Sequence, residues 1–190
     1  IVLRNNGAVT HTNDGSITLI GDSMALDGTA TVSTGAGTVT ILQRTDGVAI
    51  NLGTAGDPSG GPLNLTDAEL DRITTGELHI GNANSGAITV TNDLALTNNT
   101  TILCLTTGST VTASAGGIVV SQLAVTAGGA VTISDDQTNV DTVAITTTTG
   151  NVIYEEPKKM QVRASHAIYF TREGRLFADG GVVATGLESG

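Results

Sequence analysis

Short runs of alternating residues recur along most of the chain, and they restrict its fold more than any other feature. Examples are residues 38–42, 87–91 and 130–134, each bordered by Gly, Asn, Asp or another turn-forming residue nearby. β-Branched residues at alternate positions favour a strand with one buried face, and Gly favours tight turns. Many runs share the pattern Gly-x-(Ile/Val)-Thr-(Ile/Val/Leu) and return at intervals of roughly 10 to 22 residues, which is typical of a stacked array.

The scarcity of aromatic residues separates two all-β architectures. An antiparallel sandwich needs hairpin turns, for which Asn6-Gly7, Asp14-Gly15 and Asp46-Gly47 are suitable, and a bulky core between its sheets. The chain has no Trp, two Tyr and two Phe, and all four aromatics lie beyond residue 150. We therefore expect an all-β, right-handed parallel β-helix (a β-solenoid) filled by Val, Ile and Leu. About 20 residues per rung would give about nine rungs and a rod on the order of 45 Å long.

One segment interrupts the strand pattern. Residues 57–62 (DPSGGP) form a turn-rich loop, and Thr66 followed by Glu69 is a capping box that marks a helix start. Leu65 and Leu70 have the spacing of a hydrophobic staple. The pattern predicts one short helix over about residues 67–73, either as an excursion from one rung or as a lid over an open part of the core.

Charge divides the chain near Gly150. Residues 1–150 hold 13 acids and three bases, whereas residues 151–190 hold five of each. We interpret 1–150 as the solenoid body and 151–190 as an atypical C-terminal strand segment, with a hairpin across 172–174 and a further strand over 181–185. Since an open sheet edge pairs with other chains unless it is covered, this segment is either a cap or a joint between subunits.

A basic, aromatic end that meets an acidic body favours head-to-tail contact, because Tyr and Arg are enriched at interface cores. Such contact gives an open filament when the rotation does not close. The candidate intersubunit contacts are Tyr154, Lys158, Lys159, Arg163, Tyr169, Phe170, Arg172, Arg175 and Phe177.

No motif predicts a catalytic residue, a metal site or a cofactor. The three His, at positions 11, 79 and 166, are far apart, and Cys104 is the single cysteine, so neither a zinc cluster nor an intrachain disulfide is expected. Asp135, Asp136 and Asp141 are expected to be solvated turn carboxylates, although weak calcium binding at Asp135 and Asp136 stays open. The net charge of −10 argues against nucleic-acid binding.

Two alternative functions occur among β-helix proteins. A carbohydrate-active β-helix enzyme would need acids, bases and aromatics along a groove, and Asp67, Glu69 and Asp71 stand at a helix start where acids are favoured anyway. An ice-binding solenoid would need flat columns of Thr-x-Thr, and such pairs occur at 29–31, 38–40, 89–91 and 110–112 without one constant interval. We therefore expect a protein that is not an enzyme.

No apolar run approaches the roughly 18 residues that a membrane span requires. The chain opens at Ile1 without an initiator Met or a visible signal peptide, so we expect a processed product or an excised fragment.

The body resembles the filamentous-haemagglutinin-like exoproteins of bacteria. Residues 15–28, 35–42 and 60–81 carry the resemblance, which covers about residues 10–135 and leaves 151–190 outside it. The resemblance implies a parallel β-helix, an extracellular or cell-surface location and an adhesive or scaffolding role, with host or cell-surface glycans as the ligand class. The expected partner is either the chain itself, in a head-to-tail polymer, or neighbouring repeats of a longer adhesin.

Overall fold

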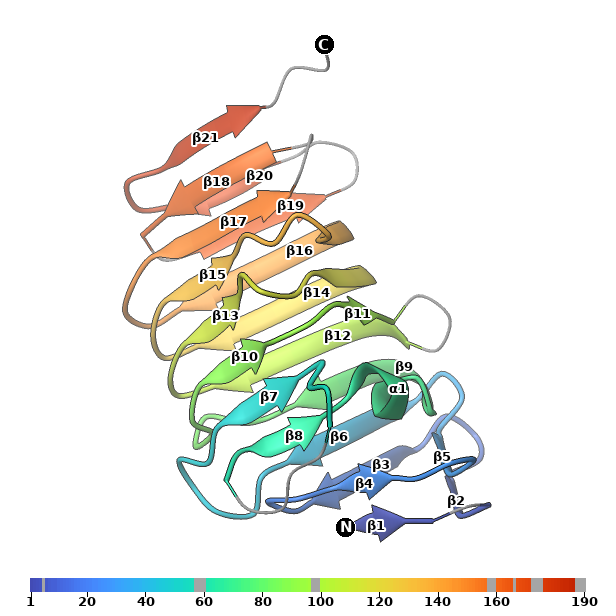
Figure 1. Cartoon of the computed structure of the whole chain (residues 1–190). Coiled ribbons are helices and arrows are strands. Elements are labelled where there is room, and N and C mark those ends of the chain that lie inside the picture. Colours follow the sequence, from blue (N-terminus) through green and yellow to red (C-terminus); the bar gives the residue numbers. More distant parts are fainter. Residues whose placement is uncertain are drawn as a thin grey trace.

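The computed structural model describes residues 1–4, 6–56, 61–96, 100–156, 160–165, 167–171 and 176–186. They form a β-solenoid of about seven turns. In Figure 1 the chain of the upper body crosses the front from left to right, returns along the back and climbs one level with each turn, so the coil is right-handed. The predicted fold class is confirmed, but the predicted number of about nine rungs is too high. An excursion and two hairpins use residues that the estimate assigned to rungs.

The front sheet has eight strands, with two short strands below it (Figure 1). From bottom to top its order is β8 (Leu63–Leu65), β7 (Ile50–Leu52), β10 (Ile88–Val90), β13 (Val111–Ala113), β15 (Val131–Ile133), β17 (Val152–Glu156), β18 (Met160–Ala164) and β21 (Val183–Gly186). The separate pair below consists of β1 (Val2–Leu3) and β4 (Ala25–Leu26).

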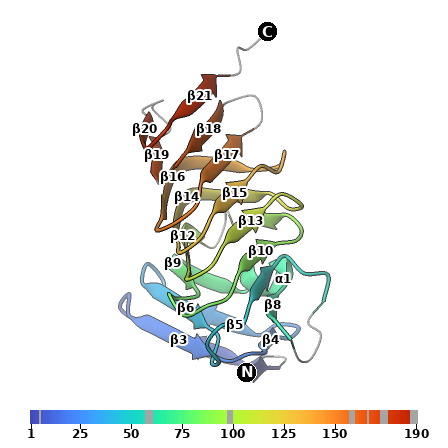
Figure 2. The same cartoon turned by 90° about the vertical axis from the view of Figure 1, so that its left-hand side faces the viewer.

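The back sheet runs the whole length of the rod, as the turned view in Figure 2 shows. From the N-terminal end its order is β3 (Ser16–Ile20), β6 (Thr38–Leu42), β9 (Ile73–Ile80), β12 (Thr100–Thr107), β14 (Ile118–Ala127), β16 (Asn139–Thr147), β19 (Ala167–Thr171) and β20 (Leu176–Asp179). Three short strands extend it along the side: β2 (Ala8–Thr10), β5 (Thr31–Ser33) and β11 (Leu94–Ala95).

The core consists of inward columns in which each rung places one aliphatic side chain on the one below. One back-sheet column is Val39, Leu78, Leu103, Leu123 and Val143, and all five are at most 2% exposed. The front sheet contributes the buried column Leu65, Leu52, Val90, Ala113, Ile133 and Tyr154. Strand alternation sends the residues between them outward, which is why every second position carries the core.

The rung length is regular only in the upper body. Leu103, Leu123 and Val143 are 20 residues apart, whereas Val39 pairs with Leu78. Between these two, the chain forms β7, drops one level to β8, and returns through helix α1 (Asp67–Leu70). The predicted excursion is therefore present.

The predicted capping box closes the N-terminus of α1. The backbone N–H of Glu69 donates to the Thr66 hydroxyl, and the Glu69 carboxylate accepts from the Thr66 backbone. The helix ends at Leu70, earlier than the predicted residue 73. Ile73 already begins β9 and is fully buried in the solenoid core.

Glu69 also joins the excursion to the rung below. Its side chain is 5% exposed, and Oε1 accepts the backbone N–H of Leu26 at 3.0 Å. Arg72 donates to the carbonyls of Leu26 and Gly28, both at 2.8 Å. These contacts hold the excursion against the turn after β4, where β4 has no strand partner on its upper side in the described residues.

Strand direction changes after β17, later than the boundary expected at Gly150. Every strand pair of the body up to β17 is parallel, but β18 pairs with β17 antiparallel, and β19 pairs with β16 antiparallel. The predicted hairpin is present as β19 and β20, and the predicted further strand is β21. The hairpin's turn, residues 172–175, lies outside the described residues.

Truncating one rung of a core column should lower stability far more than truncating its outward neighbour. Leu103→Ala should reduce the free energy of unfolding by about 2–5 kcal/mol, because it leaves a cavity in a close-packed column. Cys104→Ala, one residue on and half-buried on the outer face, should change it by about 1 kcal/mol or less. Urea unfolding followed by far-UV circular dichroism measures both, and equal losses would contradict the inward assignment.

Glu69→Ala tests the link between excursion and rung. The substitution leaves the buried Leu26 donor and the part-buried Thr66 donor without their carboxylate, so the loss should be about 1–3 kcal/mol for the Leu26 contact, with a smaller addition from Thr66. Asp46→Ala, at an exposed turn residue, is the control and should stay within about 0.5 kcal/mol. A shift in the thermal midpoint no larger than that of Asp46→Ala would show that Glu69 is not a structural contact.

Candidate functional site

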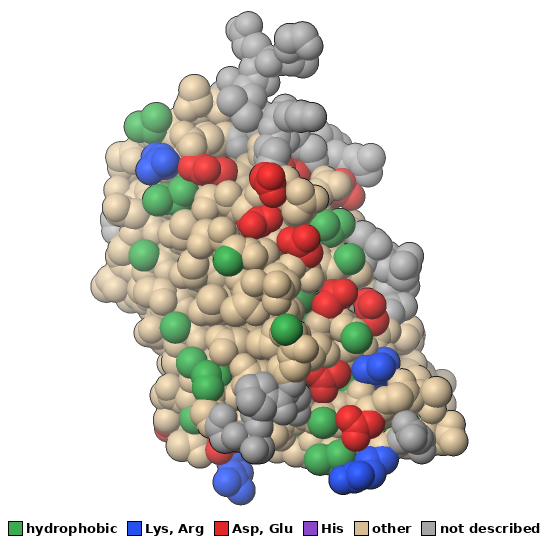
Figure 3. Space-filling view, viewed as in Figure 1, with side chains coloured by type: hydrophobic (Ala, Val, Ile, Leu, Met, Phe, Trp, Pro, Cys, Tyr) green, Lys and Arg blue, Asp and Glu red, His purple; other side chains and the backbone are tan. Residues whose placement is uncertain are grey.

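On the outward surface of the described residues, side chains that could bind a metal do not cluster. Among the described residues, no three His, Cys, Asp or Glu side chains lie together as metal ligands would. The same part of the chain contains no helix that is long and apolar enough to cross a membrane. Figure 3 shows mostly uncharged polar surface over the front strands, with acidic side chains along its right-hand edge.

The charged residues considered for an enzyme make contacts that hold the fold. Glu69 and Arg72 fix the excursion, and Asp67 accepts the backbone N–H of Ala95 at 3.0 Å. The carboxyl of Asp71 has its pKa raised by partial burial and by the nearby Asp67. Asp67 and Glu69 stabilise the start of α1. Asp67, Glu69 and Asp71 do not form a pair of carboxylates facing each other across a groove.

The aspartates considered for calcium, and His79, contact residues close to them in the sequence. Asp135 accepts the backbone N–H of Gln137, and Asp136 accepts from the Gln137 side chain. His79 lies 3.1 Å from Glu77 on the outer face of β9. Cys104 stands beside His79 in the next rung, where partial burial and the charge of Glu77 raise the pKa of its thiol. A thiol held protonated is a poor nucleophile.

One Thr column does form on the front sheet. Thr89, Thr112 and Thr132 stack on β10, β13 and β15, but Asn51 precedes them and Ile153 follows them in the same column. Three rungs at about 4.8 Å span only about 10 Å. Thr29 lies in the turn before β5 and only Thr31 belongs to that strand, while Thr38 and Thr40 lie on β6, so the predicted pairs do not make one flat face.

The predicted contact residues of the C-terminal segment fall in different environments. Tyr154 is fully buried in the front column, so its ring is inaccessible to a second chain. Arg163 is exposed on β18 and contacts Glu155 at 3.2 Å. The backbones of Tyr169 and Phe170 pair with β16, and that of Phe177 pairs with Tyr169. Lys158, Lys159, Arg172 and Arg175, together with His166, lie outside the described residues.

In the upper part of the core, Tyr154 contacts the buried acid Glu156. Its hydroxyl donates to Glu156 at 3.4 Å, and Glu156, 1% exposed, also accepts the backbone N–H of Val140 at 3.2 Å. Burial, followed by the adjacent Glu156 charge, raises the pKa of Tyr154 far above the ordinary value of a tyrosine. The sequence placed Tyr154 among interface residues because it is aromatic, but the strand register turns it inward.

Exposed aliphatic side chains gather at the two ends of the rod. Ile1, Val2 and Ile20 belong to the first rung, and Val182 and Val183 belong to the last strand with its leading turn; their exposed fractions range from 41% to 62%. They are the large exposed hydrophobic residues of the described chain. The alternation of residues 16–20 and the run Val182-Val183 were visible in the sequence, but their position at an end depends on the register of the whole stack.

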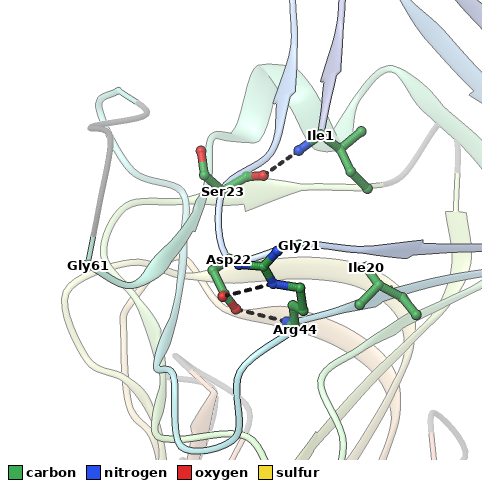
Figure 4. A pocket seen from close by; sticks show the side chains of 7 residues that line it. All are labelled: Ile1, Ile20, Gly21, Asp22, Ser23, Arg44 and Gly61. Carbon is green, nitrogen blue, oxygen red and sulfur yellow. Dashed lines mark hydrogen bonds and ion pairs between the residues drawn. The ribbon is translucent and has the colours of Figure 1, made fainter.

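A shallow hollow lies beside the first rung (Figure 4). Its volume is about 360 Å³, and its lining residues are Ile1, Ile20, Gly21, Asp22, Ser23, Arg44 and Gly61. The wall is rigid, since Asp22 accepts the backbone N–H groups of Arg44 and Thr45 at 2.8 Å and the Thr45 hydroxyl at 2.7 Å. These bonds, with that from the Thr45 hydroxyl first, lower the pKa of Asp22.

Tyr154 should make the protein less stable at alkaline pH. Its pKa is raised in the fold, so the unfolded chain loses the phenolic proton first, and the free energy of unfolding falls as the pH rises above about 10. In Tyr154→Phe this part of the loss should disappear, and in Tyr169→Phe, which keeps Tyr154, it should remain. Urea midpoints measured from neutral to alkaline pH check this, and identical slopes for both variants would contradict the buried assignment.

No family model matches the chain, and no curated protein or solved structure matches it either. The β-solenoid fold therefore stands on the structure, and the resemblance to filamentous-haemagglutinin-like exoproteins stays a prediction.

Proposed function

We propose that this chain is a structural and adhesive element of an extracellular surface, and that it works as one unit of a longer rod. The observation that carries the proposal is the continuity of the solenoid. The back-sheet ladder runs without a break from β3 to β20, the buried front column runs from Leu65 to Val162, and exposed aliphatic residues lie at both ends. A rod of this kind keeps two points at a set distance along its axis.

The outward surface supports a scaffold more than a catalyst. The acids and bases that were candidates for chemistry hold turns, a helix start and an excursion in place. Fold alone does not assign a function, so the scaffold role is inferred from these contacts. The location outside the cell and the adhesive role rest on the resemblance of residues 10–135 to bacterial exoproteins.

A rod of this kind can be part of a longer structure in two ways. The chain is either the subunit of a self-assembling head-to-tail surface fibre or a segment of a large adhesin, in which neighbouring repeats cover the ends. We favour the fibre, because the C-terminal segment holds five of the eight bases and the body holds 13 of the 18 acids, a charge distribution that suits head-to-tail contact.

Electron microscopy of the purified chain in negative stain tests the fibre. We expect filaments one solenoid wide whose mean length grows with protein concentration. The fibre proposal would be abandoned if only separate particles appear at every concentration and salt condition. Rods of constant length in the native source material, combined with that result, would favour the adhesin segment.

A further inference from the structure

The two antiparallel pairings at the C-terminal end restore the strand direction of the body. β19 runs against β16 and β20 runs against β19, so β20 is parallel to β16 and, through the parallel pairs below, to β3. On the front sheet, β18 runs against β17 and β21 runs against β18. In Figure 1, β21 points in the same direction as β1 and β4 at the opposite end.

The front core column continues to the last strand and is open there. Val183 begins β21 and lies opposite Arg163 on the outer face, so Ala184 faces inward. Extending the alternation by one residue before the strand assigns Val182 to the same inward side. Ala184 pairs with buried Val162, which pairs with Tyr154. Val182 is 43% exposed, although it faces the core side, because no further rung lies above it among the described residues.

The first rung is open in the same way. Leu3 and Ile17 pack against the core cluster but are only partly buried, while the same column positions one rung higher, Leu26 and Val39, are at most 1% exposed. The difference follows from position, since nothing described lies beneath the first rung. Both ends thus combine a free strand edge with inward aliphatic side chains that lack a covering layer.

From these features we infer that a second copy of this chain covers each end: β21 and β20 of one copy pair, in parallel, with β1 and β3 of the next, and Val182 and Ala184 meet Leu3 and Ile17. The matched strand direction favours a copy, because stacking then extends both sheets with the polarity and the inward–outward alternation that they have in the body. The inference rests on the proposed fibre and names its joint.

The contact is heterologous, so each end can be blocked separately. Val182→Lys places a charge over the open C-terminal core, and Val183→Lys places the same charge on the outer face one residue away. At the other end, Ile17→Lys faces inward and Thr18→Lys faces outward. Far-UV circular dichroism and thermal unfolding establish first that all four variants fold as the parent chain does.

Sedimentation and negative-stain microscopy then measure assembly. We expect Val182→Lys and Ile17→Lys to lower the sedimentable fraction at least ten-fold, and Val183→Lys and Thr18→Lys to assemble as the parent does. Because Val182→Lys keeps an intact N-terminal end and Ile17→Lys keeps an intact C-terminal end, an equal mixture of the two should give dimers and no filaments. If Ile17→Lys does not fold, Leu3→Lys replaces it.

The outcomes separate the joint from the fibre. Filaments formed equally well by Val182→Lys would overturn the joint and leave the proposed fibre standing. A mixture that gives filaments, or no dimers, would also overturn the joint. A parent chain that stays monomeric at all concentrations would overturn the fibre and the joint together.

Discussion

Backbone hydrogen bonding between rungs is the interaction on which the rest of this structure depends. From β6 to β16 on the back sheet and from β7 to β15 on the front sheet, each main strand pairs with a strand on either side, so these turns stack at the strand spacing of about 4.8 Å. At that spacing a column of Val, Ile and Leu fills a narrow interior without aromatic residues. Gly is required where corners stack too closely: a Cβ on Gly128 would come within 2.2 Å of the Gly108 carbonyl oxygen.

At two irregular points of the backbone ladder, a buried carboxylate accepts a backbone N–H group in place of a strand carbonyl. Glu69 accepts the N–H of Leu26 beside the excursion, and Glu156 accepts the N–H of Val140 near the change in strand direction. In a regular ladder, the carbonyl of a neighbouring strand would accept each of these hydrogen bonds. A buried charge is costly unless several donors satisfy it, and Glu69 also binds the backbone and hydroxyl of Thr66. The same residue type thus resolves the same geometric problem at two irregular points.

Much of the fold could be predicted from the sequence, because its determinants are local. Alternating Val, Ile and Thr predict the strands, the paucity of aromatics favours a solenoid over a sandwich, and Thr66 with Glu69 predicts the helix start. Register is not local. The pairing of Val39 with Leu78, the inward position of Tyr154 and the open position of Val182 all depend on which strand lies over which. Without the register, the aromatic residues of the C-terminal segment were assigned to an interface. The register instead buries Tyr154 and leaves aliphatic side chains exposed at the ends.

The excursion between β6 and β9 has a consequence for how the chain finds its register. The upper rungs repeat every 20 residues with similar aliphatic side chains, so a shift by one whole rung would exchange Leu103 for Leu123 or Val143 at little energetic cost. Such translational degeneracy would allow many misthreaded coils of nearly equal energy. The 20-residue period does not continue through β7, β8 and α1 below, nor through the reversed strands above. These two aperiodic segments bracket the repeats and make a single alignment the lowest in energy.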